Sequence, residues 1–260
     1  MGRLIALFIF CFLWAGSEDS VLIAVKSGAI KKGISESFLN ETFSHDGITI
    51  QNKILDRFAK PYEKRSWTDY RKLFVTDSRI QKGTEFYAQN KKSLNTVSLQ
   101  FGVNPFLILS IVGVESNYGQ HRGQFTVFNA LYTQIAKMPR RKKWATKEMI
   151  AYLEYCYSDS ISPHSIKGSY AGAFGYGQFI PSSFNAFAAD GNGDGVRQPY
   201  EWADVFASVG NYLVKNGYPV SNQSDEKQVY QSVYAYNHAD NYVKAVLALR
   251  DELKQNVFKD

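Results

Sequence analysis

The stretch Asn104-Pro105-Phe106-Leu107-Ile108-Leu109-Ser110-Ile111-Val112-Gly113-Val114-Glu115 predicts a helix that is buried on all sides. Its first residue, Asn104, is a good N-cap, and Pro105 suits the first helical position. The side chains that follow are apolar on every face, as in a helix that runs through a core. Glu115 ends the helix, and no Lys or Arg lies three or four residues from it in the sequence.

Glu115 is therefore the candidate catalytic residue. Burial and the negative end of a helix dipole both favour the protonated form of a carboxyl group. A carboxylic acid that stays protonated near neutral pH is what general acid catalysis requires. The alternative is a partly exposed glutamate that caps the end of the helix.

Residues 1–17 have the pattern of a secretory signal peptide. Arg3 gives a positive start, residues 4–15 are almost wholly apolar, and Gly16 and Ser17 supply small residues at the exit. The apolar run is too short to span a bilayer comfortably. We expect an exported protein that resides in the periplasm or cell envelope after removal of the signal, with an uncleaved anchor as the alternative.

Composition and charge indicate which kind of partner the protein binds. The chain has 260 residues, 45% of them hydrophobic, which is enough to bury a large core. Its formal net charge of +6, with a basic turn at residues 140–143, predicts attraction to an anionic polymer. Together with the export signal, this favours a cell-wall polymer, with peripheral membrane or cell-wall association, over nucleic acid.

Only Cys156 remains once the signal is removed. A single cysteine makes no internal disulfide, so the protein must rely on its core for stability. No motif marks Cys156 as a nucleophile, and we expect a small buried hydrophobe.

The organisation along the chain predicts a mainly α protein. Residues 20–160 have the pattern of helices joined by short turns, and helical patterns return at 204–215 and 241–254. Between residues 160 and 195 the sequence becomes rich in glycine and aromatic residues. No linker separates two independent domains. We expect the functional site to lie in this Gly-rich middle segment.

A loop of calcium-binding type follows the Gly-rich segment. Asp190, Asn192 and Asp194 occupy the first, third and fifth positions of an EF-hand pattern, Gly195 the sixth, and the carbonyl of Val196 the seventh. The late acid is either Glu201, at position 12, or Asp204, at position 15; both fit the spacing. A structural Ca²⁺ ion is predicted, and a solvated turn is the alternative.

The Gly-aromatic segment 167–183 places small residues where backbone can approach a ligand or a helix closely. It lacks the Gly-Lys-Ser/Thr ending of a phosphate loop. Ser169 and Gln178 are neutral hydrogen-bonding groups of the kind that surround a protonated acid or a sugar amide. Taken alone, the segment is equally consistent with structural packing.

With these residues in place, the chain resembles the lytic murein transglycosylases of the membrane-bound B type, including their soluble form (glycoside hydrolase family 103). Gly113-Val-Glu115-Ser-Asn-Tyr-Gly119 carries the resemblance most clearly. The other matching segments, in the expected order and spacing, are 29–34, 67–72, 139–141, 167–183, 190–204 and 236–237.

The resemblance implies a mainly α fold with a lysozyme-like core, a helical N-terminal part, a small β element and an EF-hand-like calcium loop. Residues 18–84 would form the N-terminal part, and residues 85–260 the catalytic core that contains loop 190–204. It also implies a monomer with no organic cofactor that cleaves the β-1,4 bond between N-acetylmuramic acid and N-acetylglucosamine in peptidoglycan. One glutamate would act first as acid and then as base, giving a 1,6-anhydromuramoyl product.

The same resemblance implies roles for individual residues. Glu115 would be the acid and base, and Ser169 and Gln178 would bind sugar or orient the acid. Asp204, not Glu201, would be the late calcium ligand. The residues expected to bind the rest of the substrate are Tyr70, Tyr212, Tyr236 and Tyr242, which would line the glycan groove, and Arg140 and Arg141, which would face peptide or lactyl carboxylates. The chain departs from the family where Ser116-Asn117-Tyr118 replaces the frequent Thr-Arg-Trp.

Two other functions remain open from the sequence. A hydrolytic muramidase of the goose-lysozyme kind would share the core and the lone Glu115, but water would attack in place of the C6 hydroxyl. A non-catalytic peptidoglycan-binding protein would keep its function when Glu115 is replaced.

Overall fold

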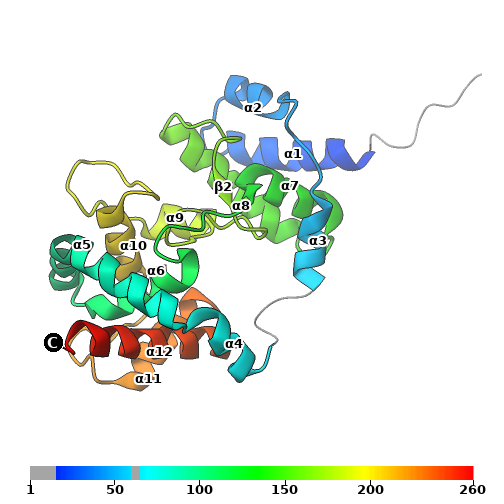
Figure 1. The fold of residues 1–260 in the computed structure, drawn as a ribbon. Coiled ribbons are helices and arrows are strands. Elements are labelled where there is room, and N and C mark those ends of the chain that lie inside the picture. The colour runs from blue at the N-terminus through cyan, green and yellow to red at the C-terminus, as the bar shows by residue number, and fades with distance from the viewer. Residues whose placement is uncertain (1–15, 60–64, 260) are drawn as a thin grey trace, which may run out of the picture.

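The structure, a computed structural model, describes residues 16–59 and 65–259, and its regular structure is almost entirely helical (Figure 1). The mainly α class predicted from the sequence is confirmed, whereas all but the last two residues of the expected signal peptide lie outside the described residues. In chain order the elements are α1 (Gly16–Ile30), α2 (Glu36–Phe43), α3 (Asn52–Ala59), α4 (Trp67–Phe74), α5 (Asp77–Phe101), α6 (Pro105–Ser116), β1 (Phe125–Thr126), α7 (Val127–Lys137), α8 (Lys142–Ser158), β2 (Lys167–Gly168), α9 (Pro181–Phe187), α10 (Trp202–Lys215), α11 (Glu226–Tyr236) and α12 (Asp240–Val257).

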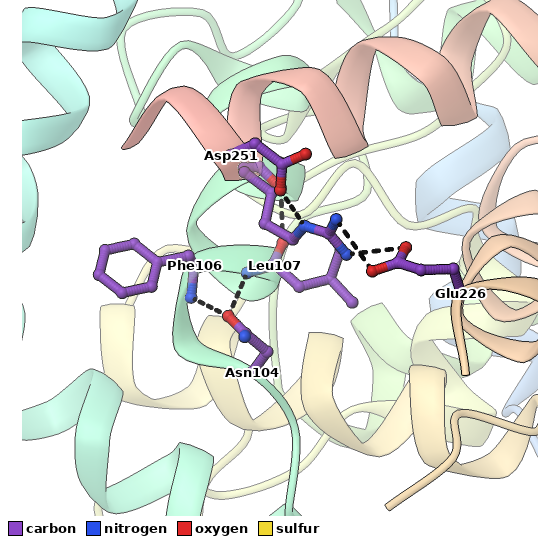
Figure 2. A network of polar contacts seen from close by, with 7 residues as sticks. Asn104, Phe106, Leu107, Glu226 and Asp251 are labelled. Atoms are coloured by element: carbon purple, nitrogen blue, oxygen red, sulfur yellow. Dashed lines mark hydrogen bonds and ion pairs between the residues drawn. The ribbon is translucent and has the colours of Figure 1, made fainter. Parts of the chain in front are cut away.

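Helix α6 begins as its sequence predicts. The side-chain oxygen of Asn104 accepts hydrogen bonds from the backbone N–H groups of Phe106 (2.9 Å) and Leu107 (3.3 Å), which satisfies two donors that the helix leaves open (Figure 2). The same view shows Glu226 of α11, which forms an ion pair with Arg250 of α12 at 3.3 Å. The start of α6 is held from outside the helix by the hydroxyl of Tyr218, which accepts from the N–H of Asn104 at 3.2 Å, while α6 itself packs on α12.

The interior of α6 is buried as predicted, and its end is set by one residue. All side chains at positions 106–114 are buried. The helix ends at Ser116 because Asn117 takes a left-handed conformation with φ of 50°, which short polar side chains tolerate. The last turn therefore leaves Glu115 partly buried at the edge of the core.

Two groups of helices meet across the Gly-rich segment. Helix α6 packs against α5, α10 and α12, with α4 and α11 packed on α12. On the other side, α7 and α8 pack together. Helix α1 packs on both of them, α3 packs on α7, and α2 packs on α1 (Figure 1). Helix α9 contacts both α8 and α10, so it lies between the two groups.

A small antiparallel β element lies in this central region. Strands β1 and β2 pair with Phe125 opposite Gly168, and isolated bridges join Gly168 to Phe174 and Phe174 to Phe179. Segment 167–179 therefore folds back on itself. The turn needs glycine at position 168, where a Cβ atom would lie 2.3 Å from the carbonyl oxygen of Ala173.

The division of the mature chain into residues 18–84 and 85–260 does not coincide with a break in the chain. Helix α5 runs unbroken from Asp77 to Phe101, and the boundary falls within it. The division therefore stays a prediction about which residues form the catalytic core. Cys156 is fully buried, as predicted, and within the described residues it forms no disulfide.

No single helix in the described part of the chain is both long and apolar enough to cross a membrane. Helices α5 and α6 meet that test only when they are taken together, and they are bent by 116° at the break between them. The apolar surface of α6 is already covered by the core of the protein.

Candidate active site

The carboxyl group of Glu115 is held by a tyrosine from the last helix. The hydroxyl of Tyr242 in α12 donates a 2.6 Å hydrogen bond to Oε1 of Glu115. Tyr242 is only 2% exposed, so its position is fixed by packing of α12 on α6. This contact orients the candidate acid at the end of the buried helix.

Tyr236 extends the site next to Tyr242. The two rings are nearly parallel, at 8°, with centroids 6.5 Å apart. Burial raises the pKa of both phenols, and the negative charge of Glu115 raises each further. Both hydroxyls therefore stay protonated in neutral solution and act as hydrogen-bond donors, with Tyr236 donating to the carbonyl of Gly177 at 2.5 Å.

The two remaining predicted tyrosines lie on either side of this pair. Tyr70 of α4 is 2% exposed and is close enough to influence the ionisation of Tyr242. Tyr212 of α10 packs its ring against Tyr236, with centroids 4.8 Å apart, and its hydroxyl donates to the carbonyl of Ala235 at 2.7 Å. The structure thus places Tyr242 and Tyr236 next to Glu115, with Tyr70 beside Tyr242 and Tyr212 beside Tyr236.

Gln178 lies on a tight turn that is tied to the same cluster. Its backbone has a left-handed φ of 50°, and its side-chain Nε2 donates to the carbonyl of Gly175 at 2.8 Å. Gly175 also has a positive φ, and a Cβ there would lie 2.7 Å from Pro199. Because Tyr236 holds the carbonyl of Gly177, the turn that carries Gln178 is fixed relative to the tyrosines.

Ser169 organises the turn that follows β2. Its hydroxyl oxygen accepts hydrogen bonds from the N–H groups of Ala171 (3.2 Å) and Ala173 (3.1 Å), and its own N–H donates to the carbonyl of Ala173 at 2.8 Å. The hydroxyl hydrogen of Ser169 remains to be donated, and a ligand acceptor could take it. Ser169 therefore stabilises the shape of this turn, besides any contact with a ligand.

The two arginines of the basic turn differ in their surroundings. Arg140 is exposed. The guanidinium of Arg141 lies over the rings of Phe58 (4.6 Å) and Trp144 (4.2 Å), and its Nε donates to Oε1 of Gln134 at 2.8 Å. Burial lowers the pKa of Arg141, but an arginine stays charged at neutral pH.

Gln134 is a site residue that the sequence analysis missed. It is fully buried in α7, and besides Arg141 it contacts the turn after β2, where its Nε2 donates to the carbonyl of Tyr170 at 3.2 Å. It therefore couples Arg141 to the turn that carries Ser169. The signal in the sequence was an amide in a mainly apolar segment, since a buried amide needs partners; Asn129 in the same helix gave an equal signal.

The calcium-like loop is closed by carboxylates that accept from backbone N–H groups. Asp190 accepts from Gly193 (2.6 Å) and Gly195 (2.7 Å). Asp204 is 1% exposed and accepts from Gly191 and Gln198, both at 2.8 Å. Asp204 thus connects the beginning of the loop, at Gly191, with its later part, at Gln198.

Glu201 has a different position from Asp204. Its carboxylate accepts from the N–H of Asp204 at 3.0 Å and so caps the start of α10. In the described residues, no group of three or more His, Cys, Asp or Glu side chains is arranged to hold a metal ion, since these carboxylates face the backbone of the loop. The predicted EF-hand-like calcium site is therefore not shown, and calcium binding stays a prediction.

Comparison with known proteins identifies the family of this chain. Residues 17–229 match the sequence model of the family described as Transglycosylase SLT domain. This chain belongs to the Transglycosylase SLT domain family. The family resemblance predicted from the sequence is confirmed.

One curated protein is similar in sequence to part of this chain. Membrane-bound lytic murein transglycosylase B of Escherichia coli K12 is 36% identical over 158 residues, which are 61% of this chain and 44% of that protein. The match therefore spans less than half the length of the curated relative.

Solved structures show the same fold over nearly the whole chain. Soluble lytic transglycosylase SltB1 from Pseudomonas aeruginosa has a TM-score of 0.82 at 25% identity, covering 91% of this chain and 99% of that one. Lytic transglycosylase Slt35 of E. coli, in complex with calcium, has a TM-score of 0.80 at 24% identity, covering 93% and 94%. These matches confirm the predicted lysozyme-like transglycosylase fold.

Proposed function

We propose that this protein is a lytic transglycosylase that cleaves the β-1,4 bond between N-acetylmuramic acid and N-acetylglucosamine in peptidoglycan. The observation that carries the proposal is the carboxyl group of Glu115, fixed by Tyr242 at 2.6 Å at the end of a buried helix. The family membership of residues 17–229 supports the reaction class.

In the first step, Glu115 donates its proton to the glycosidic oxygen as the bond to C1 of the muramoyl sugar breaks. In the second, the resulting carboxylate takes the proton of the C6 hydroxyl as that oxygen bonds to C1. The product is a 1,6-anhydromuramoyl end, and Glu115 is protonated again. One carboxyl group thus serves both steps, in contrast to the two-carboxylate scheme of most glycosidases.

The environment of Glu115 suits both steps. Partial burial favours the protonated acid, which starts the reaction. The hydrogen bond from Tyr242 favours the carboxylate, which must form and then act as a base. The Tyr242 hydroxyl is a neutral donor, so this hydrogen bond stabilises the carboxylate without itself adding a positive charge.

The other predicted residues are proposed to bind substrate around the reacting bond. Ser169 and Gln178 lie on turns whose geometry is set by backbone contacts, so they can offer hydrogen bonds to sugar groups at fixed positions. Tyr212 and Tyr236, which are partly exposed, would line the glycan groove. Tyr70 and Tyr242 are each 2% exposed and would support its wall from behind instead of touching the glycan broadly, which corrects the prediction for these two residues. Arg141, held by its two aromatic neighbours, and exposed Arg140 would face carboxylates of the lactyl or peptide groups.

Calcium is proposed to bind the loop at residues 190–204, with side-chain oxygens of Asp190, Asn192, Asp194 and Asp204 and the carbonyl of Val196 as ligands. The donor set fits, because all of these groups are hard oxygen ligands of the kind Ca²⁺ takes. None of these carboxylates forms an ion pair with a Lys or Arg of the described residues. The ion would stabilise the loop and take no part in bond cleavage.

We further propose that the protein acts in the periplasm or cell envelope as a monomer, on the glycan strands of peptidoglycan. The apolar pattern of residues 4–15 and the net charge of +6 support export and attraction to an anionic wall polymer.

The test is mass spectrometry of muropeptides released from purified peptidoglycan, with Glu115→Gln as the inactive variant and exposed Glu85→Gln as the matched control. We expect products one water lighter than hydrolytic muropeptides, absent with Glu115→Gln and present with Glu85→Gln. Products of full hydrolytic mass would assign the protein as a muramidase. Binding without release would assign it as a peptidoglycan-binding protein.

A further inference from the structure

The second candidate binding site is a cavity, and none of the predicted catalytic or substrate-binding residues lines it. It has a volume of about 540 Å³, within the range of small-molecule and peptide sites. Its walls come from the C-terminal end of α8, the approach to β2 at residues 165–167, and the loop at 196–200. The cleavage steps proposed above use none of these residues, and Val196 alone has another proposed role, through its carbonyl, in calcium binding.

The charged groups that line the cavity are mostly basic. Arg122, Lys167 and Arg197 face one acidic residue, Asp159. Within the part of the chain that the structure describes, none of the three basic residues forms an ion pair. The cavity therefore has an excess of positive charge that Asp159, which interacts with Arg197, offsets only in part.

One of these basic residues is held in place before any ligand arrives. A guanidinium nitrogen of Arg122 donates to the hydroxyl of Tyr176 at 2.8 Å. The same guanidinium lies 5.3 Å from the ring centre of Tyr176 and 5.6 Å from that of Tyr200. Because an arginine has five donors in a planar fork, it can still offer a pair of them to a carboxylate.

The rest of the lining is apolar, which limits the class of ligand. Ile161, Ile166, Val196 and Pro199 contribute aliphatic surface, and Tyr155 contributes an aromatic ring. An inorganic phosphate or a flexible polyanion would use the basic residues and leave this surface uncovered. A short peptide with carboxylates and small apolar side chains would use both.

The cavity is connected through the chain to the turns of the active site. Lys167 lies two residues before Ser169, and its carbonyl accepts from the hydroxyl of Tyr200 at 3.3 Å. Tyr176, which holds Arg122, lies two residues before Gln178. A ligand in the cavity would therefore contact the chain two residues before Ser169, at Lys167, and the arginine that Tyr176 holds.

We infer that this cavity binds a carboxylate-bearing peptide stem of the peptidoglycan, separately from the glycan held at Glu115. The inference rests on the proposed function, because it takes the second ligand from the same polymer. Seating a stem here favours strands that carry peptides, because binding at this cavity holds the strand near the catalytic helix and adds to the affinity of the glycan groove.

The test measures binding apart from catalysis, in the inactive Glu115→Gln protein. The probe is the free stem tetrapeptide, titrated by NMR, with the amidated tetrapeptide and inorganic phosphate as comparison ligands. We expect the free peptide to shift the resonances of Lys167 and Tyr200. We also expect Arg122→Gln/Arg197→Gln to weaken the affinity for the peptide by about ten-fold or more. Each substitution removes a charge-assisted hydrogen bond to a peptide carboxylate, and such bonds are stronger than neutral ones.

Lys91→Gln/Lys92→Gln removes the same charge from exposed positions of α5 and should leave the affinity unchanged. Lys167→Gln alone should weaken binding if the double variant does not fold. Equal affinity for the amidated peptide or for phosphate, or equal loss in the two double variants, would overturn the inference. A failure of muropeptide release by the unmodified protein would instead refute the proposed function and leave the peptide-binding result to be judged by itself.

Discussion

The hydroxyl of Tyr242 and the carboxyl of Glu115 are 127 positions apart in the sequence and 2.6 Å apart in the structure. Tyr242 is buried between α6 and the other tyrosines, so it approaches the carboxyl group from one fixed direction. The hydrogen bond favours the carboxylate form of Glu115, whereas partial burial favours the acid. A group that must alternate between the two forms benefits from this balance.

Replacing Tyr242 by Phe should therefore reduce activity more than stability. A hydrogen bond to a charged group is worth about 1.5–3 kcal/mol, so we expect the rate of muropeptide release to fall roughly ten- to hundred-fold. Exposed Tyr157→Phe is the matched control and should keep full activity. An unchanged rate in Tyr242→Phe would show that this contact plays no part in catalysis.

Removal of calcium should lower the stability of the protein more than its rate at 25 °C. If the ion holds loop 190–204, a chelator in excess should reduce Tm by roughly 5 °C, because a ligand that binds only the folded state stabilises it. Asp190→Asn should show the lower Tm with or without chelator, and Asp46→Asn, at an exposed position, should respond as the unmodified protein does. A Tm that does not respond to chelator would refute the structural calcium site.

The Tyr118 hydroxyl is, among the described residues, the one buried side-chain polar atom without a hydrogen-bond partner. Tyr118→Phe should therefore raise the free energy of unfolding by about 1 kcal/mol, measured by urea denaturation. A decrease in stability would mean that the hydroxyl has a partner in solution.

Gly113 of α6 makes room for the same ring. A Cβ at position 113 would lie 2.7 Å from the hydroxyl oxygen and 2.8 Å and 2.9 Å from two ring carbons of Tyr118. Gly113→Ala should lower the free energy of unfolding by about 1–3 kcal/mol through overpacking. Because ring carbons are also in the way, adding Tyr118→Phe should not restore stability; full restoration would contradict this account.

Acidification should weaken the contact between the two histidines His164 and His45. Their rings stack at 4.0 Å, and a ring nitrogen of His164 lies 2.9 Å from the carbonyl oxygen of Thr42. Burial lowers the pKa of His164, and His45 lowers it further. A lowered folded-state pKa means that this contribution to stability is complete above about pH 6.5 and is lost as the pH falls.

Urea denaturation at several pH values between about 5 and 8 would measure this effect. His164→Gln should make stability less dependent on pH in that range, whereas exposed His121→Gln should not. A protein whose stability rises on acidification through this range would contradict the assignment.

Local features could be predicted from the sequence because near neighbours decide them. Asn104 and Pro105 set the start of α6 through contacts within one helical turn, and uninterrupted apolar residues require that the helix be buried. The end of the helix is set by Asn117, which takes the left-handed position that glycine more often occupies. The family was also identified from short motifs in order, and the match over residues 17–229 confirms it.

What only the tertiary structure decided depends on packing between distant segments. The choice of Tyr242 as the partner of Glu115 follows from the packing of α12 on α6, and no sequence spacing encodes it. Arg141 reaches the turn after β2 through Gln134, because α7 packs against α8. The sequence by itself determined the residue types of the site and the helix that carries the acid. Only the close packing of side chains far apart in the chain determined which groups touch it, and which basic residues line the second cavity.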